Sequence, residues 1–223
     1  MSTRLTVQES ADGAHAAYRN ALDLLQDAIH LYDDNRYARA VALFILAIEE
    51  ASKPSILAFI AATDDDAKRE EFWKQFKWHR AKNLPGALPF AVQELAVEFG
   101  KTMPPDDRLA AAWKDGPRAL DLLKQDALYT RQDGTGGWTI PKESVRLTLA
   151  MRLSEIAASC VAAAEQNPVI HEAGMALFVQ HFGPALRANA GFREADVAYR
   201  KAVIDAKLAP PGWSDPGFDP WLK

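Results

Sequence analysis

Apolar side chains recur at helical spacing over most of the chain, and this pattern predicts an all-α protein. In residues 12–33 the repeat occupies one face and ends at the turn-forming run Asp33-Asp34-Asn35. Ser10 or Asp12 is expected to cap this first helix. Because most of the remaining sequence consists of alanine, leucine, glutamate, glutamine, lysine and arginine, which favour helix, we expect a helical bundle.

Residues 41–48 are apolar on every side of a helical projection. A helix without a polar face must be covered all round, so the helix that starts near Arg36 is predicted to be the central rod of the bundle. Pro54 lacks the N–H group that an interior helical residue donates. A kink is therefore expected near Glu50.

Other elements are expected from the same periodicity. Helices are predicted over residues 64–83, 90–100, 105–129 (interrupted at Gly116-Pro117) and 141–166, with one or two more to about residue 207. The glycine-rich turn 133–137 separates residues 129–130 from 138–140, and these flanks could form one short β-hairpin. We expect a single domain over residues 1–208 and a Pro- and Trp-rich tail over residues 209–223.

Bulk properties favour a cytoplasmic protein that does not enter a membrane. The longest apolar run is far shorter than the roughly 20 residues that a membrane crossing needs. The N-terminal segment lacks the apolar core of a signal peptide. Cys160 is the only cysteine, so no internal disulfide can form. Since the net charge is −4, contact with RNA would require a local basic patch.

Charged residues directly follow the apolar segment. Glu49 stands four residues before Lys53, the favourable order for a helical ion pair. Helical projection places Arg39, Glu50 and Lys53 on one face. Because the preceding turns are buried, some of these charges are expected to be buried and therefore paired. Two interpretations remain open: an internal ion-pair network that joins helices, and the polar floor of an active site.

Basic and aromatic residues alternate, without an acid, over residues 73–82. Lys74, Lys77 and Arg80 lie beside His79, and such a pattern suits RNA, with charges for phosphates and rings for bases. The structural alternative is that this helix begins acidic and ends basic, as the helix dipole favours. The histidines show no metal-binding spacing, so neither a metal nor a cofactor is expected.

Several motifs, in order along the chain, resemble the AbiV-type abortive infection proteins. They are Asn20-Ala21, Leu31-Tyr32, Arg36-Tyr37-Ala38-Arg39-Ala40, Glu49-Glu50-Ala51-Ser52-Lys53, His79-x-x-Lys82, Leu123-Lys124-Gln125, Leu128-Tyr129, Trp138 and Pro141. Together they span about two thirds of the chain, with an AbiV-like core at about residues 14–145. The resemblance implies a HEPN-like helical bundle with additional C-terminal helices.

The resemblance also implies an antiphage function, in which a toxin-like effector blocks translation or cleaves RNA in infected cells. Many HEPN proteins are metal-independent endoribonucleases that act as homodimers, with an Arg-x4-6-His pair that faces the dimer cleft. In this sequence Lys74, instead of an arginine, precedes His79 by five residues. A homodimer that acts on RNA or the translation machinery without a cofactor is the resulting expectation.

On this interpretation the predicted catalytic residues are His79, Lys82, Glu50 and Lys53. His79 would serve as the acid/base or would orient the phosphate, the two lysines would stabilise phosphate charge, and Glu50 with Arg39 would hold the site together. The predicted RNA-binding residues are Arg36, Arg39, Lys74, Lys77 and Arg80, and Glu49 with Lys53 is the predicted structural ion pair.

A second functional class stays open from the sequence. The protein would then be a non-catalytic helical interaction module that binds a phage or host protein through its helical surface and aromatic tail.

Overall fold

The computed structural model describes residues 4–77, 116–132, 135–211 and 213, and the helices predicted within residues 78–115 lie outside them. The described helices are α1 (Val7–Asp33), α2 (Tyr37–Ala51), α3 (Lys53–Ala62), α4 (Asp66–Lys77), α7 (Gly116–Leu128), α8 (Pro141–Ser144), α9 (Leu147–Glu165), α10 (Glu172–Ala188) and α11 (Arg193–Asp205), with the 3-10 turn η1 (Pro168–Ile170). Strands β1 (Arg131–Gln132) and β2 (Trp138–Thr139) pair antiparallel. The all-α fold and a short hairpin are thus confirmed, although β1 lies just after the predicted flank 129–130, because the pairing begins closer to the turn.

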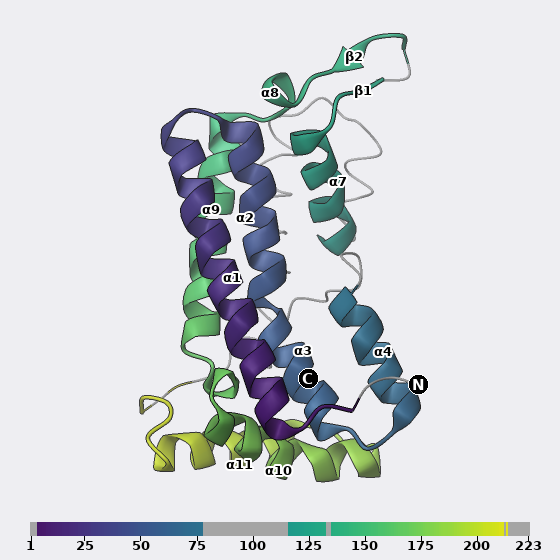
Figure 1. Ribbon diagram of the computed structural model, residues 1–223, viewed down its shortest axis with the longest axis vertical. Coiled ribbons are helices and arrows are strands. Elements are labelled where there is room, and N and C mark those ends of the chain that lie inside the picture. Colours follow the sequence, from purple (N-terminus) through teal and green to yellow (C-terminus); the bar gives the residue numbers. More distant parts are fainter. Residues whose placement is uncertain (1–3, 78–115, 133–134, 212, 214–223) are drawn as a thin grey trace.

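The long helices form an elongated bundle. α1, α2 and α9 run side by side along the long axis, and α3 continues below α2 (Figure 1). α7 packs against α2, and α4 packs against α3. α10 and α11 lie across the lower end of the bundle, whereas the β1–β2 hairpin projects from its upper end (Figure 1).

The prediction of a central rod is confirmed for most of α2, although Leu43 and Leu46 remain partly exposed. Val41, Phe44, Ile45 and Ile48 have no exposed surface, because α1, α7 and α9 cover different sides of the helix. Burying each such side chain contributes about 1.5–3 kcal/mol relative to leaving it in water. α2 is therefore the element around which the core is organised.

α1 begins earlier than the sequence analysis expected. Its N-cap is Thr6, whose hydroxyl accepts the Glu9 backbone N–H at 3.1 Å. In return the Glu9 carboxylate accepts the Thr6 backbone N–H at 2.8 Å, which completes a capping box. The Glu9 carboxylate also accepts the Thr6 hydroxyl at 2.9 Å, and the two bonds that it accepts, the backbone one first, lower the pKa of Glu9. Ser10 and Asp12 lie inside the helix, so their assignment as caps was wrong.

Proline sets a break after α2, as predicted. α2 ends at Ala51 and α3 begins at Lys53. Pro54 therefore lies in the first turn of α3. Backbone N–H groups in a first turn form no intrahelical hydrogen bond, so the helix loses nothing by having a proline there. Ser52, between the two helices, donates its hydroxyl to the Glu49 carbonyl at 2.7 Å.

The single helix predicted over residues 141–166 is in fact two. α8 covers one turn, and the extended backbone at Val145 and Arg146 separates it from α9. Val145 is buried, so this extended step places an apolar side chain in the core between the two helices.

Among the helices that the structure describes, α9 is long and apolar enough to cross a membrane by length and composition alone. It packs against α1 and α2 and buries Leu149, Leu153 and Ala157. Its other side carries the exposed ion pair between Arg152 and Glu155. A helix that contributes one face to a protein core can have the same composition, and in α9 a third of the apolar window is buried in this way.

An aromatic cluster joins the lower helices to the bundle. The rings of Phe178 and Phe182 stack with centroids 4.2 Å apart, and Tyr199 meets Phe178 edge-on at 5.4 Å. Trp213, from the start of the tail, contacts Tyr199 at 6.2 Å and is buried. The first tail aromatic therefore docks on the bundle.

Gly174 tests the packing of α10 against η1. A Cβ atom at this position would lie 2.0 Å from the Pro168 carbonyl oxygen, a backbone atom that cannot rotate away. We expect Gly174→Ala to lower the free energy of unfolding by about 3 kcal/mol. The measurement is urea denaturation followed by circular dichroism. Gly191→Ala is the matched control, because no atom lies within 4 Å of its added Cβ; equal stability of the two variants would contradict the packing.

Candidate functional site

The C-terminal end of α2 carries a buried ion pair with α7. Lys124 Nζ donates to Glu49 Oε1 at 2.7 Å, and the two side chains are only 7% and 5% exposed. The same ammonium lies 3.6 Å from Asp121 Oδ1. Because burial of either charge alone would cost several kcal/mol, the pair fixes α7 against α2.

A second acid–lysine pair lies beside the first. Glu50 is turned by about 100° from Glu49 on the same helix. Lys53 Nζ donates to Glu50 Oε1 at 2.5 Å, and their side chains keep 18% and 17% of their surface. This ammonium also lies 5.0 Å from the ring centroid of Phe76 in the last turn of α4, within cation–π distance. α2, α3 and α4 therefore meet at a polar, partly accessible point.

The predicted ion pair between Glu49 and Lys53 is not formed, because Lys53 pairs with Glu50 and Glu49 with Lys124. The physical reason is the direction of the two acids. Glu49 faces the buried interface with α7, and Lys124 on the α7 side of that interface pairs with it. Glu50 lies on the more exposed side, and the break at Ser52 brings Lys53 to it. Local spacing alone does not distinguish the two acids.

Lys124 was quoted in the sequence motifs but received no role there. A signal for it exists in the amphipathic pattern of α7: Leu120, Lys124 and Ala127 follow helical spacing on one face, and all three are buried. A lysine inside an apolar stripe requires a buried acid, and Glu49 at the end of an apolar helix is such an acid.

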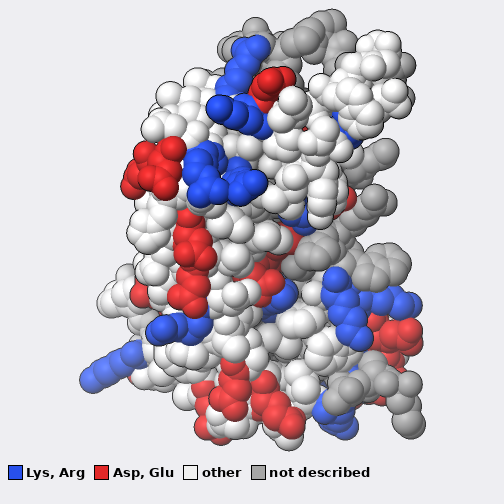
Figure 2. Space-filling view, turned by 45° about the horizontal axis from the view of Figure 1, so that its top comes forward, with Lys and Arg blue, Asp and Glu red and all other residues white. Residues whose placement is uncertain are grey.

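Arg39 does not join Glu50, contrary to the expectation that the two residues hold one site together. Both lie on the same face of α2, but eleven residues of helix separate them by about 16 Å. Arg36 and Arg39 instead line a cavity of about 710 Å³ at the opposite end of α2. Figure 2 shows Lys and Arg side chains grouped at the upper end of the molecule.

The remaining predicted RNA-binding residues divide into two sets. Lys74 and Lys77 are exposed on α4, where Lys74 forms an ion pair with Glu70 at 3.3 Å and the Lys77 ammonium lies 5.9 Å from the Trp73 ring. His79, Arg80 and Lys82 lie outside the described residues.

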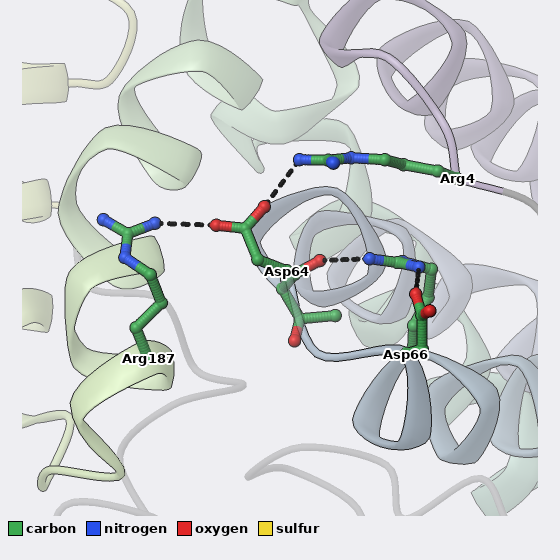
Figure 3. Close-up of polar contacts among 6 residues, drawn as sticks. Arg4, Asp64, Asp66 and Arg187 are labelled. Carbon is green, nitrogen blue, oxygen red and sulfur yellow. Dashed lines mark hydrogen bonds and ion pairs between the residues drawn. The ribbon is translucent and has the colours of Figure 1, made fainter.

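Polar contacts hold α4 in place at its N-terminal end (Figure 3). Asp64 accepts from Arg4 at 2.5 Å and from Arg187 of α10 at 3.0 Å, so the carboxylate joins the chain start to the lower helices. Buried Arg69 donates to the Thr63 carbonyl at 3.1 Å. Together with the contact between Lys53 and Phe76, these bonds fix both ends of the described helix.

Two kinds of chemistry find no support among the described residues. Burial raises the pKa of the Cys160 thiol to about 11, so this cysteine is a poor nucleophile at neutral pH. Within the described ranges no three His, Cys, Asp or Glu side chains gather in a way that could hold a metal ion.

The structure is an all-α bundle around α2, whose last turn carries Glu49 and Glu50 and whose end is followed by Lys53 at the start of α3. A comparison with protein-family models matches residues 9–162 to the HEPN family described as AbiV. The chain belongs to this family, which makes it an abortive-infection protein of the HEPN type. Searches of the curated proteins and of the solved structures gave no match.

The ion pair between α2 and α7 can be tested by removing its cation. We expect Lys124→Met to lower the free energy of unfolding by about 3–5 kcal/mol, because the buried Glu49 carboxylate loses the ammonium that faces it. Urea denaturation measures the change. Lys201→Met removes a lysine whose ion pair with Asp205 is exposed, so it should cost less than about 1 kcal/mol. A similarly small loss for Lys124→Met would disprove the structural role of the pair.

The Cys160 thiol should resist alkylation in the folded protein. Its pKa rises from 9.0 to about 11, so at a given neutral pH the thiolate is about a hundred times rarer than in the unfolded chain. We expect iodoacetamide to label the folded protein about a hundred times more slowly than the urea-unfolded protein, as read by mass spectrometry. Because the folded protein favours the neutral thiol, Cys160 contributes to the free energy of unfolding. This contribution is fully present below pH 9 and is lost as the pH rises from about 9 to about 11. Equal labelling rates would contradict the burial.

Proposed function

We propose that this protein is an antiphage effector that cleaves RNA, and thereby stops translation, at a site beside the break between α2 and α3. Membership of the AbiV family supports an abortive-infection function. The proposed location of the site is supported by one observation: Lys53 contacts both Glu50 and Phe76. This contact joins the end of the central helix to the last turn of α4.

Chain connectivity relates this point to His79. Phe76 precedes His79 by three residues, and three residues of any conformation span at most about 11 Å. The proposal takes the His79 imidazole to act beside Lys53 and Glu50. Lys82 follows three residues later in the sequence.

The proposed reaction is the attack of a ribose 2′-oxygen on the adjacent phosphorus. The bond from the 2′-oxygen to phosphorus forms, the bond to the 5′-oxygen breaks, and a cyclic phosphate remains. Neutral His79 takes the proton of the 2′-hydroxyl and returns it to the departing 5′-oxygen. Lys53 and Lys82 stabilise the charge on the phosphate oxygens, and Glu50 positions the Lys53 ammonium. No electron is transferred, so the step needs no cofactor.

One observation favours the alternative, a non-catalytic module that binds a phage or host protein. Apolar side chains gather unburied near the β1–β2 hairpin, where Tyr129 and Trp138 are 58% and 66% exposed and Leu128 and Ile140 are also exposed. Such a group of exposed apolar residues is typical of interaction surfaces. We also propose that two copies of the chain associate through this surface to form a homodimer.

The catalytic proposal is tested by expression in growing cells and by incubating purified protein with RNA. We expect wild-type protein to stop protein synthesis and cleave RNA. His79→Ala and Lys53→Met should each reduce the cleavage rate by about a hundredfold or more, because a general base or a charge stabiliser is lost. Lys201→Met, which removes an exposed lysine far along the chain, should remain toxic.

The outcome that separates the two functions is the pattern across variants. If His79→Ala and Lys53→Met remain as toxic as wild type, and RNA stays intact in every case, the ribonuclease proposal fails. Loss of toxicity in Tyr129→Ser with Trp138→Ser would then favour the interaction module. Melting temperatures of all variants ensure that misfolding is not the cause.

A further inference from the structure

The face of α4 that meets the rest of the bundle carries Lys68, Phe72 and Phe76. These residues follow one another at helical spacing, so their side chains leave the helix in the same direction. Arg69 is buried, whereas Phe72 and Phe76 are only partly covered. A helix that buries little apolar surface opens locally at a low cost in free energy, so the few contacts of this face decide where α4 lies.

The first of the three side chains binds the end of α10. Lys68 Nζ donates to the Leu186 carbonyl at 3.0 Å and to Asn189 Oδ1 at 3.3 Å, although Leu186 is 118 residues away in the sequence. Asn189 is the C-cap of α10 and lies in the left-handed region, with a φ of 50°. The C-terminal end of a helix carries partial negative charge, which an ammonium group stabilises. Lys68 therefore joins the start of α4 to the end of α10.

The second side chain meets the aromatic cluster of the lower helices through Phe59. The Phe72 ring stacks on the Phe59 ring of α3, with centroids 5.3 Å apart and planes inclined by 20°. Phe59 also meets Phe178 of α10 edge-on at 5.3 Å, and Phe192, directly before α11, at 5.9 Å. Because Phe59 contacts α4 and α10 at once, a movement of α10 shifts the ring on which Phe72 stacks.

The third side chain reaches the proposed catalytic site. Phe76 lies about two helical turns beyond Lys68, and its ring centroid is 5.0 Å from the Lys53 ammonium. α4 is thus one continuous helix that begins at the end of α10 and ends beside Lys53. α10 and α11 follow residues 9–162, which match the AbiV family. The segment that holds α4 is therefore outside the matched part of the chain.

We propose that the C-terminal helices α10 and α11 set the position of α4 and thereby regulate the proposed catalytic site. While the Lys68 ammonium is bound to the end of α10, α4 is closed and Phe76 lies against Lys53. When this bond is lost, α4 opens and Phe76 leaves Lys53. α4 is then the two-state element through which a change at α10 reaches the site. The effect on RNA cleavage rests on the proposed function, whereas the opening of α4 does not.

Hydrogen exchange of the full chain, read by mass spectrometry, measures the opening of α4 directly. We expect Lys68→Met to raise the exchange rates of the backbone amides in residues 72–77 about tenfold or more, because a charge-assisted bond to α10 is lost. The amides of residues 186–190, at the end of α10, should also exchange faster, since coupling between two elements is reciprocal. Exchange in α9, which packs against α1 and α2, should not change.

Three further variants separate the loss of this bond from a general loosening of α4. Lys74→Met makes the same substitution at an exposed lysine whose ion pair with Glu70 lies within the helix, so exchange should stay within about twofold of wild type. Lys68→Arg keeps a cation at the end of α10 and should restore slow exchange. Asn189→Gly removes one acceptor of Lys68 but suits the left-handed cap, so exchange in α4 should rise several-fold while α10 stays folded.

RNA cleavage by the same variants tests the regulation of the site. Lys68→Met should lower the cleavage rate about tenfold or more, because α4 leads into the segment that carries His79. Lys201→Met, on the exposed surface of α11, should cleave RNA as wild type does.

The two measurements fail independently. Exchange in residues 72–77 that is as slow in Lys68→Met as in wild type would overturn the proposed role of α10. Faster exchange with undiminished cleavage would overturn the regulation of the site. If wild type cleaves no RNA, the ribonuclease proposal and this regulation fail together, while the exchange rates still decide whether α10 sets the position of α4.

Discussion

The absence of a polar face on α2 is the constraint on which the rest of this structure depends. Val41, Phe44, Ile45 and Ile48 can leave water only where other helices cover them, and α1, α7 and α9 do so, while Leu43 and Leu46 stay partly exposed. Because α7 comes from a distant part of the sequence, its contact with α2 closes a long loop of chain. The entropy lost in that closure must be offset by the apolar surface buried on α2.

The same constraint explains why charged residues gather where α2 ends. Glu49 is still within the buried length of the helix, so it needs the Lys124 ammonium from α7. One residue later Glu50 reaches the partly exposed side and pairs with Lys53, which follows the break set by Pro54. The polar point that we propose as an RNA site is therefore a direct result of ending an apolar helix next to two other helices.

Sequence patterns predicted the features that depend on local interactions. The apolar run gave the central helix, and the glycine-rich turn gave the β1–β2 hairpin. The capping box from Thr6 to Glu9 was also readable from local spacing, and it was missed. The partner of Glu49 could not be read in this way, because it depends on which face of α7 meets α2. A helical projection shows the direction in which each side chain leaves the helix but not the distance between residues along the axis. Arg39 and Glu50 therefore seemed to be neighbours, although they lie at opposite ends of α2.

The way in which charges are paired separates buried from exposed cations in the part of this protein that the structure describes. Buried cations have partners: Lys124 meets Glu49, and Arg69 meets Thr63 and Asp66. A single exposed arginine without an ion pair among the described residues, such as Arg19, is ordinary, because water solvates it. A buried cation has no such solvent, so each one must be placed opposite an acid or a carbonyl when the helices pack.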